Sequence, residues 1–246
     1  MHKPSPRKRR VARTAGIGRA RRSYLRALRN EICRWRVLGC TWCGFRVRGE
    51  VSAVSDLKEE LHGKLRAGRA VLLSKLENLS EYDRRRPMTP TGTNLLGLVK
   101  HLAGLEYGYL GESFGRPAPE SIPWIEDGSI WQGADMWAKP DESSEYIGDL
   151  YRRACAHADG VVAALDLEAP GSVAHWPEDR RDTTLGVILI RMVAETAQHA
   201  GHADIVRELI DGKGGPDQDT IDESTWREYI AQVQAAASAF LTGPEM

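Results

Sequence analysis

Three ionisable side chains lie on the inward face of a helical segment near the C-terminal end of the chain. Read at seven-residue steps, the segment gives two rows: Leu185, Met192, His199 and Val206, and Ile188, Glu195, His202 and Leu209. Both rows have the spacing of a buried helix face. Burying an unpaired carboxylate costs several kcal/mol, so Glu195 needs a partner. His199, four residues further on, stands on the same face and within its reach.

A further histidine is predicted to point inward from a second helix. His101 follows Leu98 by three residues and precedes Leu105 by four. Metal sites in helical bundles are built from side chains on facing helices. A His/Glu/His set with an open position is typical of catalytic zinc or non-haem iron rather than of a closed structural zinc. The same spacing also fits a metal-free network in which Glu195 accepts hydrogen bonds from His101 and His199, and spacing alone does not separate the two interpretations.

The elements that must position these residues are predicted to be helices throughout. Helical periodicity covers residues 56–79, 93–114, 142–165, 182–211 and 222–241. No strand-like alternation is present, so the sequence predicts an all-α domain over residues 55–242, a four-helix bundle with an extra C-terminal helix. Residues 84–92 are predicted to form a loop, and residues 116–140 a longer loop over one end of the core. Lys100 and Glu106 are expected on the helix surface, and His157 at the edge of the inward stripe of the third helix.

The charge of the chain divides at about residue 50. Residues 1–50 carry 15 Lys or Arg and 2 acidic residues, whereas the rest of the chain carries 19 and 32. Such a segment buries too little apolar surface to order itself, so we expect a disordered basic arm. The arm could bind nucleic acid through its charge. Alternatively, it could precede the true start at Val51 or Val54, because an excess of Arg over Lys, 26 to 8, is typical of GC-rich genomes where GTG start codons are common. The acidic remainder of the chain argues against nucleic acid as a partner.

A membrane protein and an exported protein are not expected. Apolar runs such as Val187 to Ile190 are far short of the roughly 20 residues that span a bilayer. Cys155 has no second cysteine within residues 55–242, which fits a reducing compartment. The sequence therefore favours a cytoplasmic protein.

Two motifs carry a family resemblance. PTGTNLLGLVKHL at residues 90–102 and ETAQHAGHAD at residues 195–204 resemble the DinB superfamily, and specifically its branch with the actinobacterial mini-circle protein. The resemblance extends over about residues 55–215. It implies a DinB-like bundle that holds a divalent metal through His101, Glu195 and His199, with His101, His199 and His202 as the alternative ligand set. Many relatives have His at the position of Glu195, whereas mycothiol-dependent maleylpyruvate isomerases have Glu there.

The resemblance also implies a reaction class. DinB relatives include S-transferases and isomerases that use mycothiol or a similar small thiol. A metal in an open site lowers the pKa of a thiol and so supplies the thiolate nucleophile, and His202 would accept the thiol proton. Zinc is the expected metal, with nickel or iron as alternatives, and the expected partners are a small-molecule thiol, an electrophile and a second copy in a homodimer. A metal-dependent hydrolase and a non-catalytic metal-binding stress protein are the competing hypotheses.

Overall fold

The computed structural model describes residues 53–213 and 221–241, with side-chain environments from residue 57 onward. The predicted basic arm of residues 1–50 lies outside the described residues, and so do the expectations of disorder, nucleic-acid binding and a later start.

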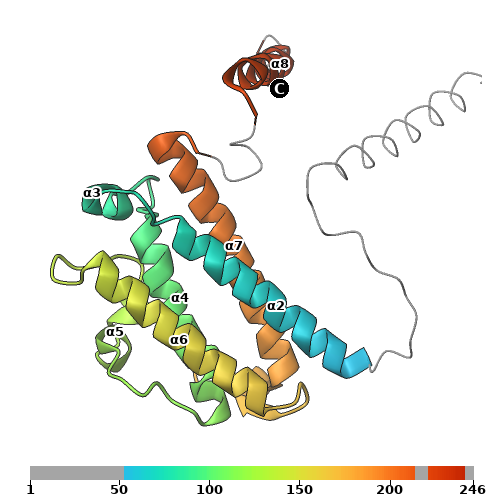
Figure 1. Cartoon of the computed structure of the whole chain (residues 1–246). Coiled ribbons are helices and arrows are strands. Elements are labelled where there is room, and N and C mark those ends of the chain that lie inside the picture. The colour runs from blue at the N-terminus through green and yellow to red at the C-terminus, as the bar shows by residue number, and fades with distance from the viewer. Residues whose placement is uncertain (1–52, 214–220, 242–246) are drawn as a thin grey trace, which may run out of the picture. The chain divides into compact units, whose positions relative to one another are not determined.

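Four long helices make up most of the described fold (Figure 1). Their bounds are α2, Ala53–Ser74; α4, Leu95–Leu110; α6, Ser144–Ala164; and α7, Leu185–Asp211. The Asn94 side chain caps α4 by accepting from the Gly97 N–H, and Ser143 caps α6 in the same way through Tyr146. Gly212 ends α7 in the left-handed conformation that glycine adopts without strain. The predicted all-α bundle is confirmed.

Contacts between the helices fix their directions. The α2 helix packs along α7, and α4 packs against both α6 and α7. Gly68 of α2 lies beside Thr196 of α7, and Lys75, directly after α2, forms an ion pair with Asp204 further along α7. The two helices therefore run in the same direction. The α4 and α7 helices run in opposite directions, which places the second turn of α4 beside the C-terminal half of α7.

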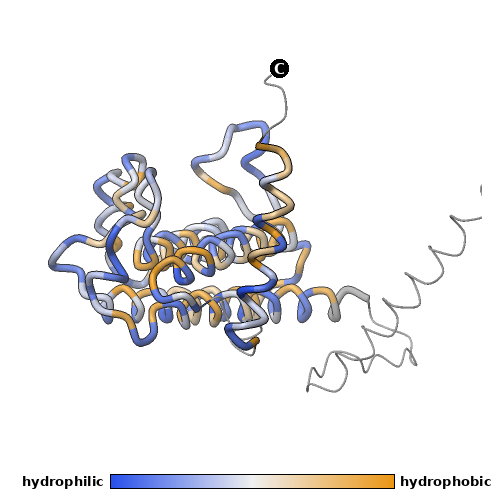
Figure 2. The backbone as a smooth tube through the Cα atoms, turned by 90° about the horizontal axis from the view of Figure 1, so that it is seen from above, coloured by the Kyte–Doolittle hydropathy of each residue, from blue (hydrophilic) through white to orange (hydrophobic). Residues whose placement is uncertain are grey.

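Apolar side chains from these helices fill the interior in two clusters. Figure 2 shows apolar residues recurring along each helix, as expected for helices with an inward face. The first cluster centres on Leu72, Leu98 and Leu150, and the second on Leu65, Leu110 and Ile188. These packed clusters hold α4 and α7 at a fixed separation.

Shorter elements differ from the sequence expectations. The first helix ends at Ser74 rather than near residue 79, and a short helix α3, Glu81–Arg85, begins in its place and extends into the predicted loop. Two three-residue strands, β1 at Pro170–Ser172 and β2 at Asp182–Thr184, pair antiparallel before α7. The expectation of no strand is therefore wrong, because strands this short are too brief to display an alternating pattern. Short 3₁₀ turns are η2, Glu112–Phe114; η3, Ser129–Gln132; and η4, Glu178–Arg180.

The long connection from α4 to α6 packs against the bundle at several points along its length. It contains the short helix α5, Pro123–Glu126, whose Trp124 is buried in the first apolar cluster. Trp131 and Trp137, by contrast, are largely exposed. The C-terminal helix α8, Glu223–Ser238, is capped by Asp222, whose side chain accepts from the Thr225 N–H. Among the described residues, no helix has the length and apolar character needed to cross a bilayer.

Candidate functional site

His101 is held by a carboxylate that the sequence analysis did not identify. Its Nδ1 lies 2.6 Å from Oδ2 of Asp135, a buried residue of the connection between η3 and α6. Because an ionised carboxylate only accepts hydrogen bonds, Nδ1 of His101 carries the proton. The lone pair of His101 is then on Nε2, the nitrogen that can bind a metal.

His199 and Glu195 of α7 face this histidine across the interface between α4 and α7. The ring centroids of His101 and His199 are 5.0 Å apart, and Nε2 of His199 lies 3.7 Å from Oε2 of Glu195. The structure therefore brings together the three residues that the sequence predicted as metal ligands. They come from two helices whose packing fixes their approach.

His199 is neutral at physiological pH. Burial, reinforced by the neighbouring imidazole of His101, lowers the pKa of His199 to about 4, although Glu195 opposes the shift. Its Nδ1 is buried without a hydrogen-bond partner, and its Nε2 is beyond hydrogen-bonding distance of Glu195. A neutral imidazole that the protein leaves unsatisfied is a competent metal ligand.

His202 lies at the solvent edge of the site. Its ring centroid is 5.6 Å from that of His199, and the residue is exposed. In the row predicted to face inward, Ile188 is buried, Glu195 is half-buried, and His202 and Leu209 are exposed. A straight α-helix rotates by about 20° per seven-residue step, so the far end of the row turns toward solvent.

Arg191 holds the second carboxylate of the site. Its Nη2 lies 3.2 Å from Oε1 of Glu195, and its guanidinium carbon lies 4.9 Å from the ring centroid of Tyr109 and 5.3 Å from that of Trp176. The aromatic contacts restrict where the guanidinium can lie. Arg191 stands four residues before Glu195, and this spacing was the sequence signal that could have identified it.

An aromatic cluster continues from Arg191 toward the β1–β2 pair. The Trp176 Nε1–H points to the Tyr109 hydroxyl at 3.4 Å, and the same hydroxyl lies 3.2 Å from Nε2 of His175. Trp131 lies with its ring centroid 5.8 Å from that of His175. Burial, followed by the charge of Arg191, lowers the pKa of His175. Tyr109 therefore both packs in the core and joins a polar cluster beside the site.

Two charged residues expected on the surface are fully buried. Lys100 donates to the carbonyl of Trp137 and to Glu142, and its ammonium lies 4.3 Å from the ring centroid of Trp124. Glu106 accepts two hydrogen bonds from Arg69 of α2 inside the bundle. The surface expectation was wrong because each charge finds a buried partner. His157, which bonds to the carbonyl of Arg116, is not among these site contacts.

The side chains of the candidate site include donors that can bind a cation. In the described part of the chain, no three His, Cys, Asp or Glu side chains already stand as a complete metal-binding group. The donor types nevertheless suit a divalent cation: two imidazoles and one carboxylate, with His101 oriented by a second carboxylate. His199, with neither ring nitrogen satisfied by the protein, would gain the missing partner from a bound cation.

Comparisons with known proteins place the chain in a family. Among solved structures, a conserved protein from Enterococcus faecalis is similar at 12% identity, with 63% of this chain and 98% of that chain covered and a TM-score of 0.49. A comparison with curated proteins found no match. The family model described as Mycothiol-S-transferase matches residues 60–212, which include α4, α7 and every residue of the candidate site. The chain thus belongs to the mycothiol-S-transferase family, a DinB-like family, as its two motifs led us to expect.

Proposed function

We propose that this protein is a metal-dependent transferase that joins a small thiol of the mycothiol type to an electrophile. The proposal assigns His101, Glu195 and His199 as ligands of one divalent cation, with zinc as the expected metal. The observation that carries it is the approach of His101 on α4 to His199 on α7, at 5.0 Å between ring centroids, inside a chain of the mycothiol-S-transferase family.

A cation held at this site would lower the pKa of a bound thiol and favour the thiolate. The protein residues supply the rest of the environment. His101 and His199 offer imidazole nitrogens, and Asp135 and Arg191 restrain His101 and Glu195 respectively. Because His202 is exposed and adjacent to His199, it is suited to take the thiol proton and pass it to solvent.

The surroundings favour a small substrate on the side of Glu195. Tyr109, Trp176 and the exposed Trp131 line that direction with aromatic surface, and the Arg191 guanidinium lies against the first two. Aromatic surface with a few polar groups is typical of small-molecule sites.

The test begins with protein purified without chelator. We expect about one equivalent of divalent metal, and conjugation of mycothiol to a thiol-reactive bimane that stops when the metal is removed. His101→Ala and His199→Ala should each lose the metal and the activity, whereas His157→Ala should keep both. Retention of full metal by either of the first two variants would refute the proposed coordination.

A further inference from the structure

We propose that Asp135 is a positioning residue that fixes the His101 ring in the metal-binding tautomer. This inference rests on the proposed metal site but concerns a residue outside the predicted ligand set. The 2.6 Å contact between Oδ2 of Asp135 and Nδ1 of His101 carries it. Asp135 is only 4% exposed, so water competes little for this hydrogen bond.

The contact selects between two forms of a neutral imidazole. Protonation on Nδ1 leaves the lone pair on Nε2, and protonation on Nε2 leaves it on Nδ1. Since the Asp135 carboxylate can only accept, it stabilises the first form and disfavours the second. A metal-ligating histidine is commonly oriented in this way, and loss of the outer carboxylate weakens metal binding.

The backbone that carries Asp135 is fastened to α4 at the two residues that follow it. The Asn94 side-chain amide donates to the carbonyl of Met136 at 3.1 Å, and the Lys100 ammonium donates to the carbonyl of Trp137 at 3.0 Å. Asn94 is also the N-cap of α4, so one side chain both starts the helix and holds the loop. Asp135 is thereby placed relative to the helix that carries His101.

Gly97 makes this close approach possible. A Cβ atom on Gly97 would lie 1.8 Å from the carbonyl oxygen of Met136, which is backbone and cannot simply rotate away. The loop therefore lies directly on the first turn of α4. His101 is four residues after Gly97, on the same face of the helix, which places its ring beside Asp135.

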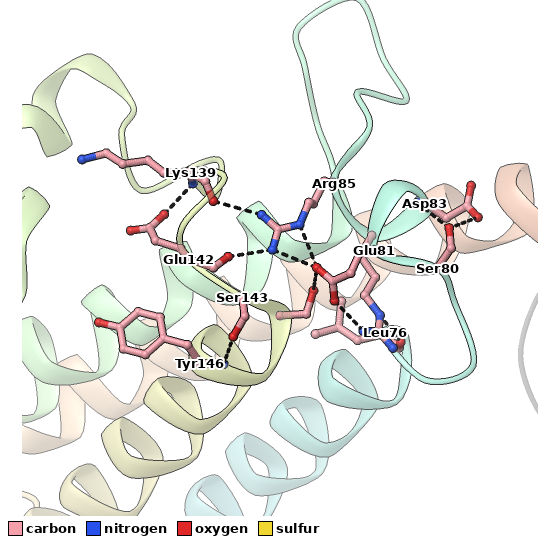
Figure 3. Close-up of polar contacts among 11 residues, drawn as sticks. Leu76, Ser80, Glu81, Asp83, Arg85, Lys139, Glu142, Ser143 and Tyr146 are labelled. Atoms are coloured by element: carbon pink, nitrogen blue, oxygen red, sulfur yellow. Dashed lines mark hydrogen bonds and ion pairs between the residues drawn. The ribbon is translucent and has the colours of Figure 1, made fainter.

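The far end of the loop is fastened by α3. Arg85 donates to the carbonyls of Lys139 and Glu142, at 3.1 and 2.6 Å, and to the carboxylate of Glu81 (Figure 3). The segment from Asp135 to Glu142 is thus held at both ends by side chains of α3 and α4. We therefore infer that the position of Asp135 is set by the fold before any metal binds.

The first measurement uses the metal-free wild-type protein, so no variant has to fold. Long-range ¹H–¹⁵N spectra should show His101 protonated on Nδ1 and unprotonated on Nε2. In Asp135→Asn, which keeps the size of the side chain, the His101 signals should shift toward the Nε2-protonated form. Protonation of His101 on Nε2 in the wild-type protein would overturn the inference.

The second measurement is metal affinity by chelator competition, with zinc as the probe. Asp135→Asn should bind zinc about 10- to 100-fold more weakly than the wild-type protein. The matched control is Asp127→Asn, because Asp127 lies in the same connection and its side chain accepts a hydrogen bond from nearby Ser129. Zinc affinity of Asp135→Asn within twofold of wild type would refute the role of Asp135 while leaving the proposed function intact. Failure of the wild-type protein itself to bind zinc or any divalent metal would refute the proposed site.

Gly97→Ala provides an independent variant that leaves both His101 and Asp135 in place. The added Cβ must displace the Met136 carbonyl, so we expect weaker zinc binding and the same change of tautomer. Because both substitutions act through the contact between Asp135 and His101, the double variant Asp135→Asn with Gly97→Ala should bind zinc only slightly more weakly than the single variant with the lower zinc affinity. Fully additive losses would contradict a shared mechanism.

Discussion

The buried ion pair between Arg69 and Glu106 gives the sharpest stability prediction. Nε and Nη2 of Arg69 bond to the two Glu106 oxygens at 2.7 and 2.6 Å, and the side chains are 5% and 0% exposed. Burial alone would lower the pKa of Arg69, but the Glu106 carboxylate beside it raises that pKa above its usual value. Burial raises the pKa of Glu106, and the charge of Arg69 opposes that shift, so each side chain stabilises the charge of the other.

Glu106→Gln keeps the shape of the side chain and removes its charge. Breaking a buried pair on one side costs about 3–5 kcal/mol, because the remaining charge stays buried. Arg69 retains a second ion pair with Asp159, a partly exposed residue, so we expect the lower end, about 3 kcal/mol. For a bundle of this size, that corresponds to a fall in Tm of about 6–12 °C.

Urea unfolding followed by circular dichroism measures this loss. The double variant Arg69→Met with Glu106→Gln should be no less stable than Glu106→Gln alone, because it leaves no buried cation without its partner. Glu223→Gln is the control: its ion pair with Arg227 is exposed, and we expect a change below about 0.5 kcal/mol. A loss of less than about 1 kcal/mol in Glu106→Gln, or simple additivity in the double variant, would refute this account.

Four further predictions follow from the described contacts. In metal-free protein, burial and the neighbouring imidazoles lower the pKa of His199 from 6.5 to about 4, so between these pH values the unfolded chain binds a proton that the folded chain does not. The contribution to the free energy of unfolding is therefore complete above pH 6.5 and falls by up to about 3 kcal/mol as the pH is lowered toward 4. Urea unfolding of His199→Gln should show a smaller fall over the same pH range. Lys100→Met leaves the Glu142 carboxylate without its buried ammonium partner, and we expect urea unfolding to show a loss of about 3 kcal/mol in the free energy of unfolding. An unchanged free energy of unfolding would contradict this prediction. Burial raises the pKa of the Cys155 thiol, so iodoacetamide should label it far more slowly in the folded protein than in urea, and equal rates would contradict its burial. Removal of metal by chelator should abolish conjugation and leave the helical circular dichroism spectrum in place, whereas loss of the fold would favour a stabilising role for the metal.

Much of the candidate site could be predicted from the sequence because its proposed ligand residues lie on helices. Helical spacing is periodic, so His101 and His199 could be placed on inward faces without knowledge of the fold. Asp135 could not be found in this way, because it lies in a connection without periodicity and its contact with His101 depends on how that connection returns to α4. His202 was placed too far inward because a strict seven-residue row does not allow for the rotation of a straight helix.

The errors in the fold have a similar origin. Lys100 and Glu106 were assigned to the surface because charged residues usually lie there, and only the positions of Glu142 and Arg69 in space show why these two are buried. Patterns in one sequence report on local periodicity, whereas pairing between distant charges depends on the assembled bundle.

The separation of His101 and His199 along the chain affects how the protein matures during synthesis. His101 and its carboxylate leave the ribosome early, whereas His199 follows only after all of α6 and the first half of α7. A nascent or truncated chain that lacks α7 has only one of the two imidazoles of the proposed site. If the proposed site holds a metal, the metal therefore binds late, and unfinished chains do not bind it there.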